Sequence, residues 1–126
     1  RVVSERGFSV VYDTAEHIFS QMEEEKFRPD DSPAAREDVQ RYQQCDLLII
    51  DDLGAEMVTS FVQSALYQLV NGRLISGGRT VINTNLTPRQ LGERYSPQVQ
   101  SRLEGEYRIL PFFGEDIRKL RRKQMT

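Results

Sequence analysis

The chain has 126 residues, 17 of them basic and 19 acidic, and a hydrophobic content of 38%, which describes one globular domain or part of one. No apolar run approaches the roughly 20 residues that a membrane-spanning helix needs, and no signal peptide pattern opens the chain, so we expect a cytoplasmic protein without membrane contacts. Its single cysteine excludes an internal disulfide framework, and its single histidine, without partner ligands nearby in the sequence, argues against a transition-metal site.

The N-terminal part predicts a strand followed by two helices. Residues 8–12 form the predicted strand. Asp13 and Glu16 then have the spacing of a capping box, in which two side chains satisfy backbone amides at the start of a helix. After a polar loop, Pro33 is well placed to open a second helix that ends near residue 44.

The most informative segment is residues 45–54, where four consecutive aliphatic residues lead into two carboxylates and a glycine. A run that is apolar at every position predicts a strand buried on both faces, as in a parallel sheet covered by helices. Asp51 and Asp52 would lie at the carboxyl end of this strand, where open α/β sheets bind their ligands. One acid could hold Mg²⁺ while the other activates an attacking water. A buried strand followed by an acidic helix cap is the alternative.

Strands and helices continue to alternate toward the C-terminus. Apolar residues recur at spacings of three and four between residues 61 and 75, and Gly77 ends this helical pattern. The remaining predicted elements are a strand over residues 80–84, helices starting at Thr87 and Ser96, a strand over residues 107–110 and a helix over residues 115–123. This alternation predicts an α/β fold with a mainly parallel sheet.

Five of the basic residues lie within six positions near the C-terminus: Arg118, Lys119, Arg121, Arg122 and Lys123. A basic segment on an otherwise acidic chain could contact nucleic acid phosphates. The alternative is a solvated last helix whose cations face the negative end of its own dipole.

The order of these motifs resembles the AAA+ ATPases of the DnaC and IstB type, which are bacterial and phage helicase loaders and helper ATPases of transposition. The resemblance runs from about Phe8 to the C-terminus. Its most specific parts are VINTNLTPRQLGERYSPQVQSRLEGE and YRILPFFGEDIRKLRR, after the acidic end of the buried strand. It implies a P-loop NTPase-like fold in which residues 1–126 form an ATPase core fragment, from Walker B to sensor 2.

The resemblance also implies roles for single residues. Asp51 resembles the Walker B acid that holds Mg²⁺ at the bound ATP. Asp52 resembles the catalytic acid that polarises the attacking water, a position where many relatives have glutamate. Asn85 resembles the sensor 1 amide beside the γ-phosphate, with Asn83 as the alternative.

Two arginines complete the implied site. Arg102 resembles the arginine finger, which reaches the nucleotide of a neighbouring subunit in a homo-oligomer. Arg118 resembles sensor 2, which contacts the phosphates within the same subunit. For both residues the alternative is a surface salt bridge.

No Gly-x-x-x-x-Gly-Lys-Ser/Thr sequence occurs in the chain. In the proteins that it resembles, this phosphate-binding loop precedes the strand predicted at residues 8–12, so we expect the first βα unit to be missing and the chain to be a fragment. The absent strand would lie between the strands predicted at residues 80–84 and 107–110. Strand exchange between chains is the alternative. We expect the chain alone to bind ATP poorly and to hydrolyse none.

The resemblance implies an ATP-dependent helicase loader that acts in DNA replication and primosome assembly. Its implied partners are a replicative helicase and single-stranded DNA, and its implied cofactors are ATP and Mg²⁺. A transposition helper ATPase, which delivers a transposase to target DNA, is the first alternative. A non-enzymatic interaction module of the same fold is the second.

Overall fold

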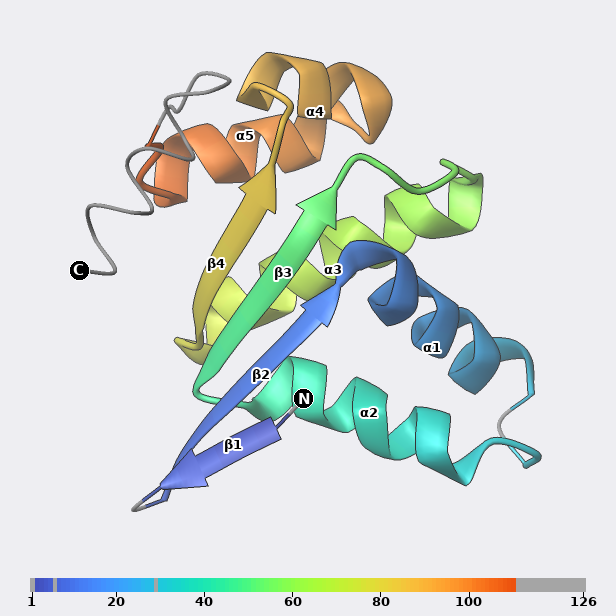
Figure 1. Cartoon of the computed structure of the whole chain (residues 1–126). Helices are drawn as coiled ribbons and strands as arrows, with labels where there is room; N and C mark the ends of the chain where they lie inside the picture. The colour runs from blue at the N-terminus through green and yellow to red at the C-terminus, as the bar shows by residue number, and fades with distance from the viewer. Residues whose placement is uncertain (1, 6, 29, 111–126) are drawn as a thin grey trace.

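The computed structural model describes residues 2–5, 7–28 and 30–110, with side chains from residue 7 onward. This part forms four strands and five helices (Figure 1). They are β1 (Val2–Glu5), β2 (Phe8–Thr14), α1 (Ala15–Phe27), α2 (Pro33–Gln44), β3 (Leu47–Leu53), α3 (Ser60–Ser76), β4 (Arg79–Thr84), α4 (Pro88–Arg94) and α5 (Pro97–Glu106). The helix predicted over residues 115–123, the basic segment and Arg118 lie outside the described residues.

The described strands form one sheet in the order β1-β2-β3-β4. β2, β3 and β4 are parallel, whereas β1 is antiparallel to β2. Tyr12 pairs with Ile49, and Ile49 pairs with Val81, so their side chains form one row across the three parallel strands. The predicted α/β class with a mainly parallel sheet is confirmed.

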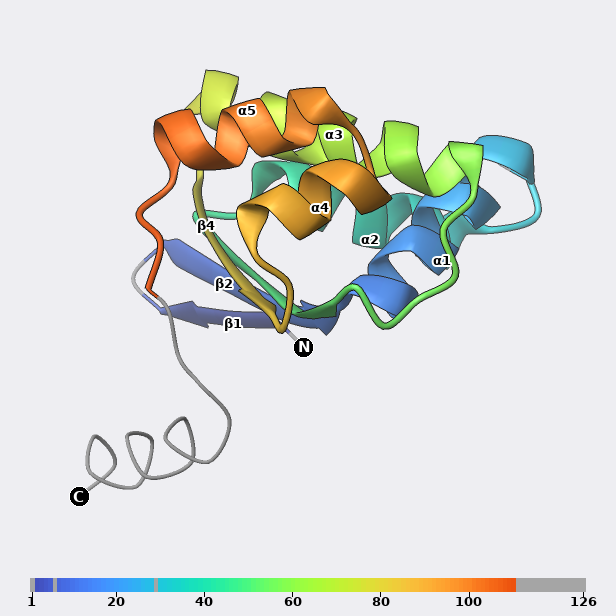
Figure 2. The ribbon, with the colours of Figure 1, turned by 90° about the horizontal axis from the view of Figure 1, so that it is seen from above.

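All described helices lie on the same side of this sheet, as Figure 2 shows. On that side Val11, Leu48 and Ile50 are at most 2% exposed and belong to one hydrophobic core with apolar residues of the helices. No described helix covers the opposite face, where Tyr12 and Val81 are 44% and 45% exposed. Within the described residues, no helix has the length and apolar character to cross a membrane.

Most predicted helix boundaries are confirmed. Pro33 is the first residue of α2, and Gly77, in the left-handed conformation (φ 80°), caps the C-terminus of α3. At the start of α4, Thr87 and Gln90 form both halves of a capping box. Local sequence rules therefore placed these boundaries correctly, because the satisfied groups lie within a few residues of each other.

The predicted strand over residues 107–110 is wrong. α5 ends at Glu106, and residues 107–110 form neither strand nor helix. A strand needs a neighbour with which to form a hydrogen-bonded ladder, and the neighbour expected between β4 and residues 107–110 is not among the described residues. Ile109 and Leu110 are consequently exposed.

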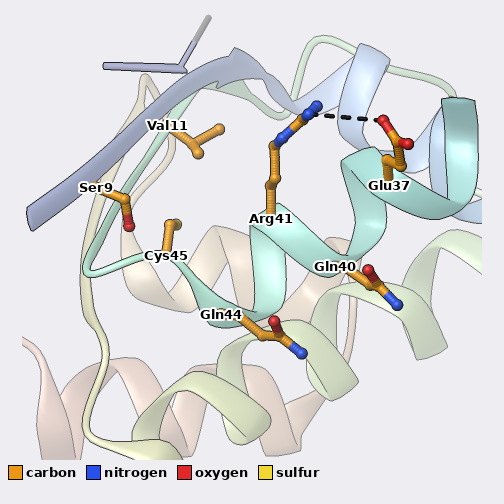
Figure 3. A pocket seen from close by; sticks show the side chains of 7 residues that line it. All are labelled: Ser9, Val11, Glu37, Gln40, Arg41, Gln44 and Cys45. Carbon is orange, nitrogen blue, oxygen red and sulfur yellow. Dashed lines mark ion pairs between the residues drawn. The ribbon is translucent and has the colours of Figure 1, made fainter. Parts of the chain in front are cut away.

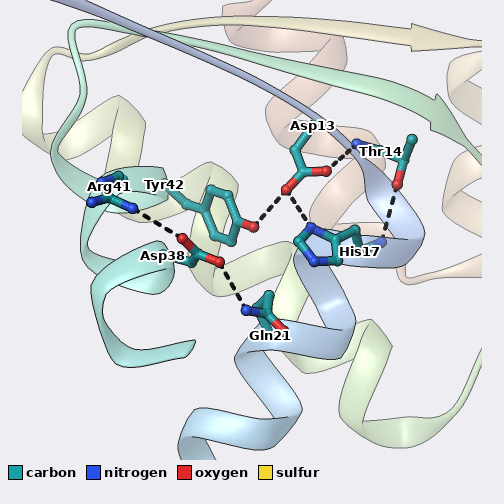
Figure 4. Close-up of polar contacts among 7 residues, drawn as sticks. All are labelled: Asp13, Thr14, His17, Gln21, Asp38, Arg41 and Tyr42. Carbon is teal, nitrogen blue, oxygen red and sulfur yellow. Dashed lines mark hydrogen bonds and ion pairs between the residues drawn. The ribbon is translucent and has the colours of Figure 1, made fainter. Parts of the chain in front are cut away.

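The predicted cap at Asp13 is also wrong, because β2 continues through Thr14. Thr14 is the N-cap of α1, and its hydroxyl accepts a hydrogen bond from the backbone amide of His17 (3.2 Å). The Asp13 carboxylate instead accepts from the Tyr42 hydroxyl (2.6 Å) and lies 2.6 Å from Nδ1 of His17 (Figure 4). Asp13 thus joins the end of β2 to both α1 and α2.

At the other end of the sheet, where the parallel strands begin, a buried cation joins the strands to the helices. Arg73, in the last turn of α3, is 1% exposed, and its guanidinium donates to five backbone carbonyls and to the Thr80 hydroxyl (2.9 Å). The carbonyls belong to Tyr42 (3.1 Å), Gln43 (3.3 Å), Cys45 (2.8 Å), Asp46 (3.4 Å) and Arg79 (2.7 Å). A Cβ on Gly78 would lie 2.8 Å from this guanidinium, so a glycine is needed there. Arg73 therefore joins α2, the start of β3 and the start of β4.

Replacing Arg73 with methionine should destabilise the fold by about 3 kcal/mol or more, because several buried carbonyls lose their donor. Urea unfolding measures the difference. Arg89→Met is the matched control, since the Arg89 side chain is 84% exposed and, among the described residues, pairs only with Glu93 on its own helix. Equal effects of the two substitutions would contradict the role assigned to Arg73.

The buried Tyr42 should make stability fall at alkaline pH. Burial, and then the hydrogen bond to Asp13, raises the pKa of the Tyr42 hydroxyl above its ordinary value of 10.0. Above pH 10 the hydroxyl of Tyr42 loses its proton in the unfolded chain and keeps it in the folded chain. The contribution of Tyr42 to the free energy of unfolding is therefore complete below pH 10 and is lost as pH rises. Between pH 10 and 11, Tyr42→Phe should lose unfolding free energy less steeply than the unmodified protein, by up to about 1 kcal/mol per pH unit. Parallel slopes in urea titrations would contradict this.

Candidate functional site

The half-buried Asp51 lies near the carboxyl end of β3. This end of β3 lies between the ends of β2 and β4 (Figure 1). One of its carboxylate oxygens accepts a hydrogen bond from the hydroxyl of Tyr12, on β2. The other oxygen accepts from the side-chain amide of Asn83, on β4, at 3.4 Å. Both neighbouring strands therefore orient this carboxylate, which lies on the sheet face that no described helix covers.

Asp52, the next residue, has a different environment. Its side chain is exposed, and its φ of 58° lies in the left-handed region that residues other than glycine adopt rarely. The pairing of β3 with β4 is irregular here, with a register shift between Ile50 and Leu53. The backbone thus turns at Asp52, so the two adjacent acids are presented differently.

The segment after the acids is held against β4 and α4. Gly54 has a φ of 108°, and a Cβ there would lie 2.7 Å from the Leu86 side chain. Glu56 is 7% exposed, and its carboxylate accepts from the backbone amide of Gly54 (3.1 Å) and from the hydroxyl of Tyr95. Arg94 lies 3.8 Å from the same carboxylate.

Burial, and then the hydrogen bond to Glu56, raises the pKa of the Tyr95 hydroxyl above its ordinary value.

The two asparagines proposed for sensor 1 lie in different places. Asn83 is the amide that contacts Asp51. β4 ends at Thr84, so the alternation of side chains along a strand does not extend to Asn85, whose side chain is exposed. The assignment of sensor 1 to Asn85, with Asn83 as the alternative, stays a prediction.

Arg102 lies on α5 and is half-buried. α5 packs against α3 and α4. Among the described residues, no hydrogen bond or ion pair is recorded for its guanidinium. The salt bridge considered as the alternative role is therefore not formed with that part of the chain, and the arginine finger stays a prediction.

The carboxylate ligands at the end of β3 suit a hard cation that keeps most of its bound water. Asp51 and Asp52 offer carboxylate oxygens, which Mg²⁺ prefers, usually with one or two carboxylates beside water and phosphate oxygens. Within the described ranges, no group of three or more His, Cys, Asp or Glu side chains could enclose a metal. The residues present therefore fit an open Mg²⁺ site and not a complete protein cage.

Two hollows in the described surface lie away from the acids. One, of about 350 Å³, lies between β2 and α2 and is lined by Ser9, Arg41 and Cys45 among others (Figure 3). The other, of about 480 Å³, lies at the amino ends of the strands, beside Asp46 and Arg79. Neither hollow includes Asp51 or Asp52.

Sequence reasoning missed Tyr12 and the buried group formed by Glu56, Arg94 and Tyr95. Tyr12 could have been found from strand alternation, which puts it on the same face of the sheet as Asp51 once β2 and β3 are paired in register. Glu56 has no comparable signal, because an acid two residues after a glycine is ordinarily part of an exposed turn.

Comparisons with known proteins bear on the fold of the chain. No family model and no curated protein matches the chain. Among solved structures, the DnaC helicase loader has a TM-score of 0.70 at 16% identity, over 83% of this chain and 62% of the loader. The replication initiator DnaA bound to AMPPCP and single-stranded DNA has 0.68 at 21% identity, over 94% and 37%. Domain III of DnaA from Thermotoga maritima has 0.64 at 24% identity, over 92% and 48%.

The chain has the AAA+ fold of the DnaC and DnaA type. The fold expected from the resemblance is confirmed. The chain spans less than two thirds of the length of each of these three structures, and at such low identity the likeness establishes the fold alone. The AAA+ fold also explains why the acids lie at the carboxyl ends of parallel strands, where such sheets bind ligands.

The left-handed backbone conformation at Asp52 allows a prediction of how substitutions there change the free energy of unfolding. Asp52→Gly should keep or raise the unfolding free energy, since glycine adopts positive φ without steric cost, whereas Asp52→Ala should lower it by about 1 kcal/mol. Asp52→Asn is the control and should stay close to the unmodified protein, because asparagine tolerates this region. If urea unfolding found alanine at least as stable as glycine, the described turn would be incorrect.

Proposed function

We propose that this chain is part of the ATPase core of a replicative helicase loader, which binds and hydrolyses ATP during DNA replication. The observation that carries the proposal is the Asp51 carboxylate, oriented by Tyr12 and Asn83 beside the exposed Asp52 at the end of a central parallel strand. The DnaC loader supports the choice, because its TM-score of 0.70 is the highest of the three structures compared.

The two acids divide the work in this proposal. Asp51 would hold Mg²⁺, which when bound neutralises negative charge on the phosphates. Hydrogen bonds from Tyr12 and Asn83 would keep its carboxylate directed toward that ion. Asp52, with an exposed carboxylate, would orient or deprotonate the attacking water, which requires a base free to approach the substrate.

The remaining contacts to the nucleotide would come from other elements. Asn85, or Asn83 as the alternative, would contact the γ-phosphate as sensor 1, and Arg118 would contact the phosphates as sensor 2. Arg102 would reach the nucleotide of a neighbouring subunit, which requires a homo-oligomer. Because the 126 residues contain no glycine-rich phosphate-binding loop, we propose the activity for a longer protein that includes this chain.

The proposed partners follow from the loader function. They are a replicative helicase, as primosome assembly requires, and single-stranded DNA, which one structurally similar DnaA binds. A replication initiator is the second candidate, because the two DnaA structures align with 92–94% of this chain and the loader with 83%. Purified replicative helicase should bind the longer protein if it is a loader, and failure to bind would favour the initiator.

The proposed active site should be shared between subunits of the longer protein. Asp52→Asn should leave ATP binding intact and abolish hydrolysis, because the amide cannot accept a proton from water. Arg102→Ala should reduce hydrolysis about 10³-fold, since a guanidinium stabilises charge that develops in the transition state. Mixing the two inactive variants should restore part of the activity, because some interfaces combine an intact acid with an intact arginine.

Arg89→Ala is the matched control, as this arginine on α4 is exposed and, within the described part of the chain, pairs only with Glu93. It should hydrolyse ATP at the unmodified rate and should not complement Asp52→Asn beyond its own activity. A fully active Arg102→Ala protein would contradict the proposed role of Arg102. An unchanged rate in Asp52→Asn would contradict the division of work between the two acids.

A further inference from the structure

Glu56 is a buried acid outside the set of residues to which the proposed ATPase mechanism gives a role. One carboxylate oxygen accepts from the backbone amide of Gly54 at 3.1 Å. The other accepts from the Tyr95 hydroxyl and lies 3.8 Å from a guanidinium nitrogen of Arg94. Arg94 also donates to the backbone carbonyl of Glu56. Burying a charged group is costly, and apolar residues in place of buried ion pairs are often as stable, so these specific contacts need an explanation.

On one side, Glu56 holds the turn that presents the two acids. Asp52 and Gly54 both have positive φ, so this turn departs from strand geometry at two of three consecutive residues. Its own backbone supplies one long hydrogen bond, from the amide of Ala55 to the carbonyl of Asp52 (3.4 Å). The bond from the Gly54 amide to Glu56 is shorter, at 3.1 Å. Two side chains outside the turn therefore hold it: the Glu56 carboxylate, and the Thr84 hydroxyl, which donates to the backbone carbonyl of Leu53 at 2.5 Å.

On the other side, Glu56 holds the corner between α4 and α5. Tyr95 is the C-cap of α4, and Ser96 is the N-cap of α5. Gln63 of α3 also donates to the backbone carbonyl of Arg94 at 3.3 Å, so this corner is held from a second element. α5 carries Arg102. The Glu56 carboxylate thus contacts both the turn that follows Asp51 and Asp52 and the corner that precedes α5.

We propose that Glu56 is a positioning residue that fixes the Asp51–Asp52 turn relative to the α4–α5 corner. Within each subunit, Glu56 fixes the position of the two acids relative to α5. The acids act on the nucleotide of their own subunit, and Arg102 on α5 acts on the nucleotide of the neighbouring subunit. The kinetic consequence rests on the proposed ATPase function, whereas the geometric link does not. A displacement of about 1 Å at a reacting centre can cost about 100-fold in rate, so a loose turn would lower kcat.

Hydrogen exchange in the longer protein tests the geometric link without ATP. Glu56→Ala should speed exchange of the Gly54 amide at least about tenfold, with a smaller rise at the α4–α5 corner and none in β2 or α2. Glu56→Gln keeps an oxygen acceptor and should restore most of the protection at Gly54. Tyr95→Phe removes only the hydroxyl and should loosen the corner. Glu37→Ala is the control, because the Glu37 side chain is 68% exposed and its one ion pair with a described residue is to Arg41 on its own helix.

Steady-state kinetics then test the positioning role. Glu56→Ala should lower kcat at least about tenfold and leave KM for ATP within about twofold, and glutamine should recover part of the loss. A uniform rise in exchange, or unchanged exchange at Gly54, would overturn the geometric link. Local loosening with a normal kcat would overturn the positioning role. If the unmodified protein hydrolyses no ATP, the proposed function fails, and the exchange experiment still decides whether Glu56 fixes the turn.

Discussion

The buried guanidinium of Arg73 organises the amino end of this sheet. The last carbonyls of a helix have no partner within it, and two of the acceptors of Arg73, on Tyr42 and Gln43, belong to the last turn of α2. A cation at that end is favoured by the helix dipole as well as by the hydrogen bonds. Other acceptors, on Asp46 and Arg79, directly precede β3 and begin β4. One side chain of α3 thus fixes both strands that this helix connects.

Carboxylates make most of the described contacts that organise the carboxyl end of the sheet. Asp13 joins β2 to α1 and α2, Asp51 joins the three parallel strands, and Glu56 joins the end of β3 to α4. The only described residue other than glycine with positive φ, Asp52, lies at this end too. Backbone strain of this kind persists only where surrounding contacts over-determine it, and it concentrates at functional sites. The amino end is therefore held by a buried cation, and the carboxyl end carries the acids for which we propose a chemical role.

Elements bounded by local signals were predictable from the sequence. The apolar run before Asp51 specified β3, and a glycine in the left-handed conformation ended α3 as its position predicted. Elements that depend on distant partners were not. β1 (Val2–Glu5) is a four-residue strand whose only described partner is β2, and residues 107–110 form no strand in the absence of a described neighbour. A β-strand is defined by its pairing, so composition alone cannot decide it.

The same division holds for the candidate site. Local sequence sufficed to put two acids at the end of a buried strand, because a continuous apolar run and its polar end are features of neighbouring residues. Only the folded chain shows that Asp51 is oriented by Tyr12 and Asn83, which come from strands 39 and 32 residues away in the sequence. Only the folded chain shows that Asp52 turns outward and that Glu56 is buried. Strand register and the packing of α4 decide these features, and both arise from contacts between residues far apart in the chain.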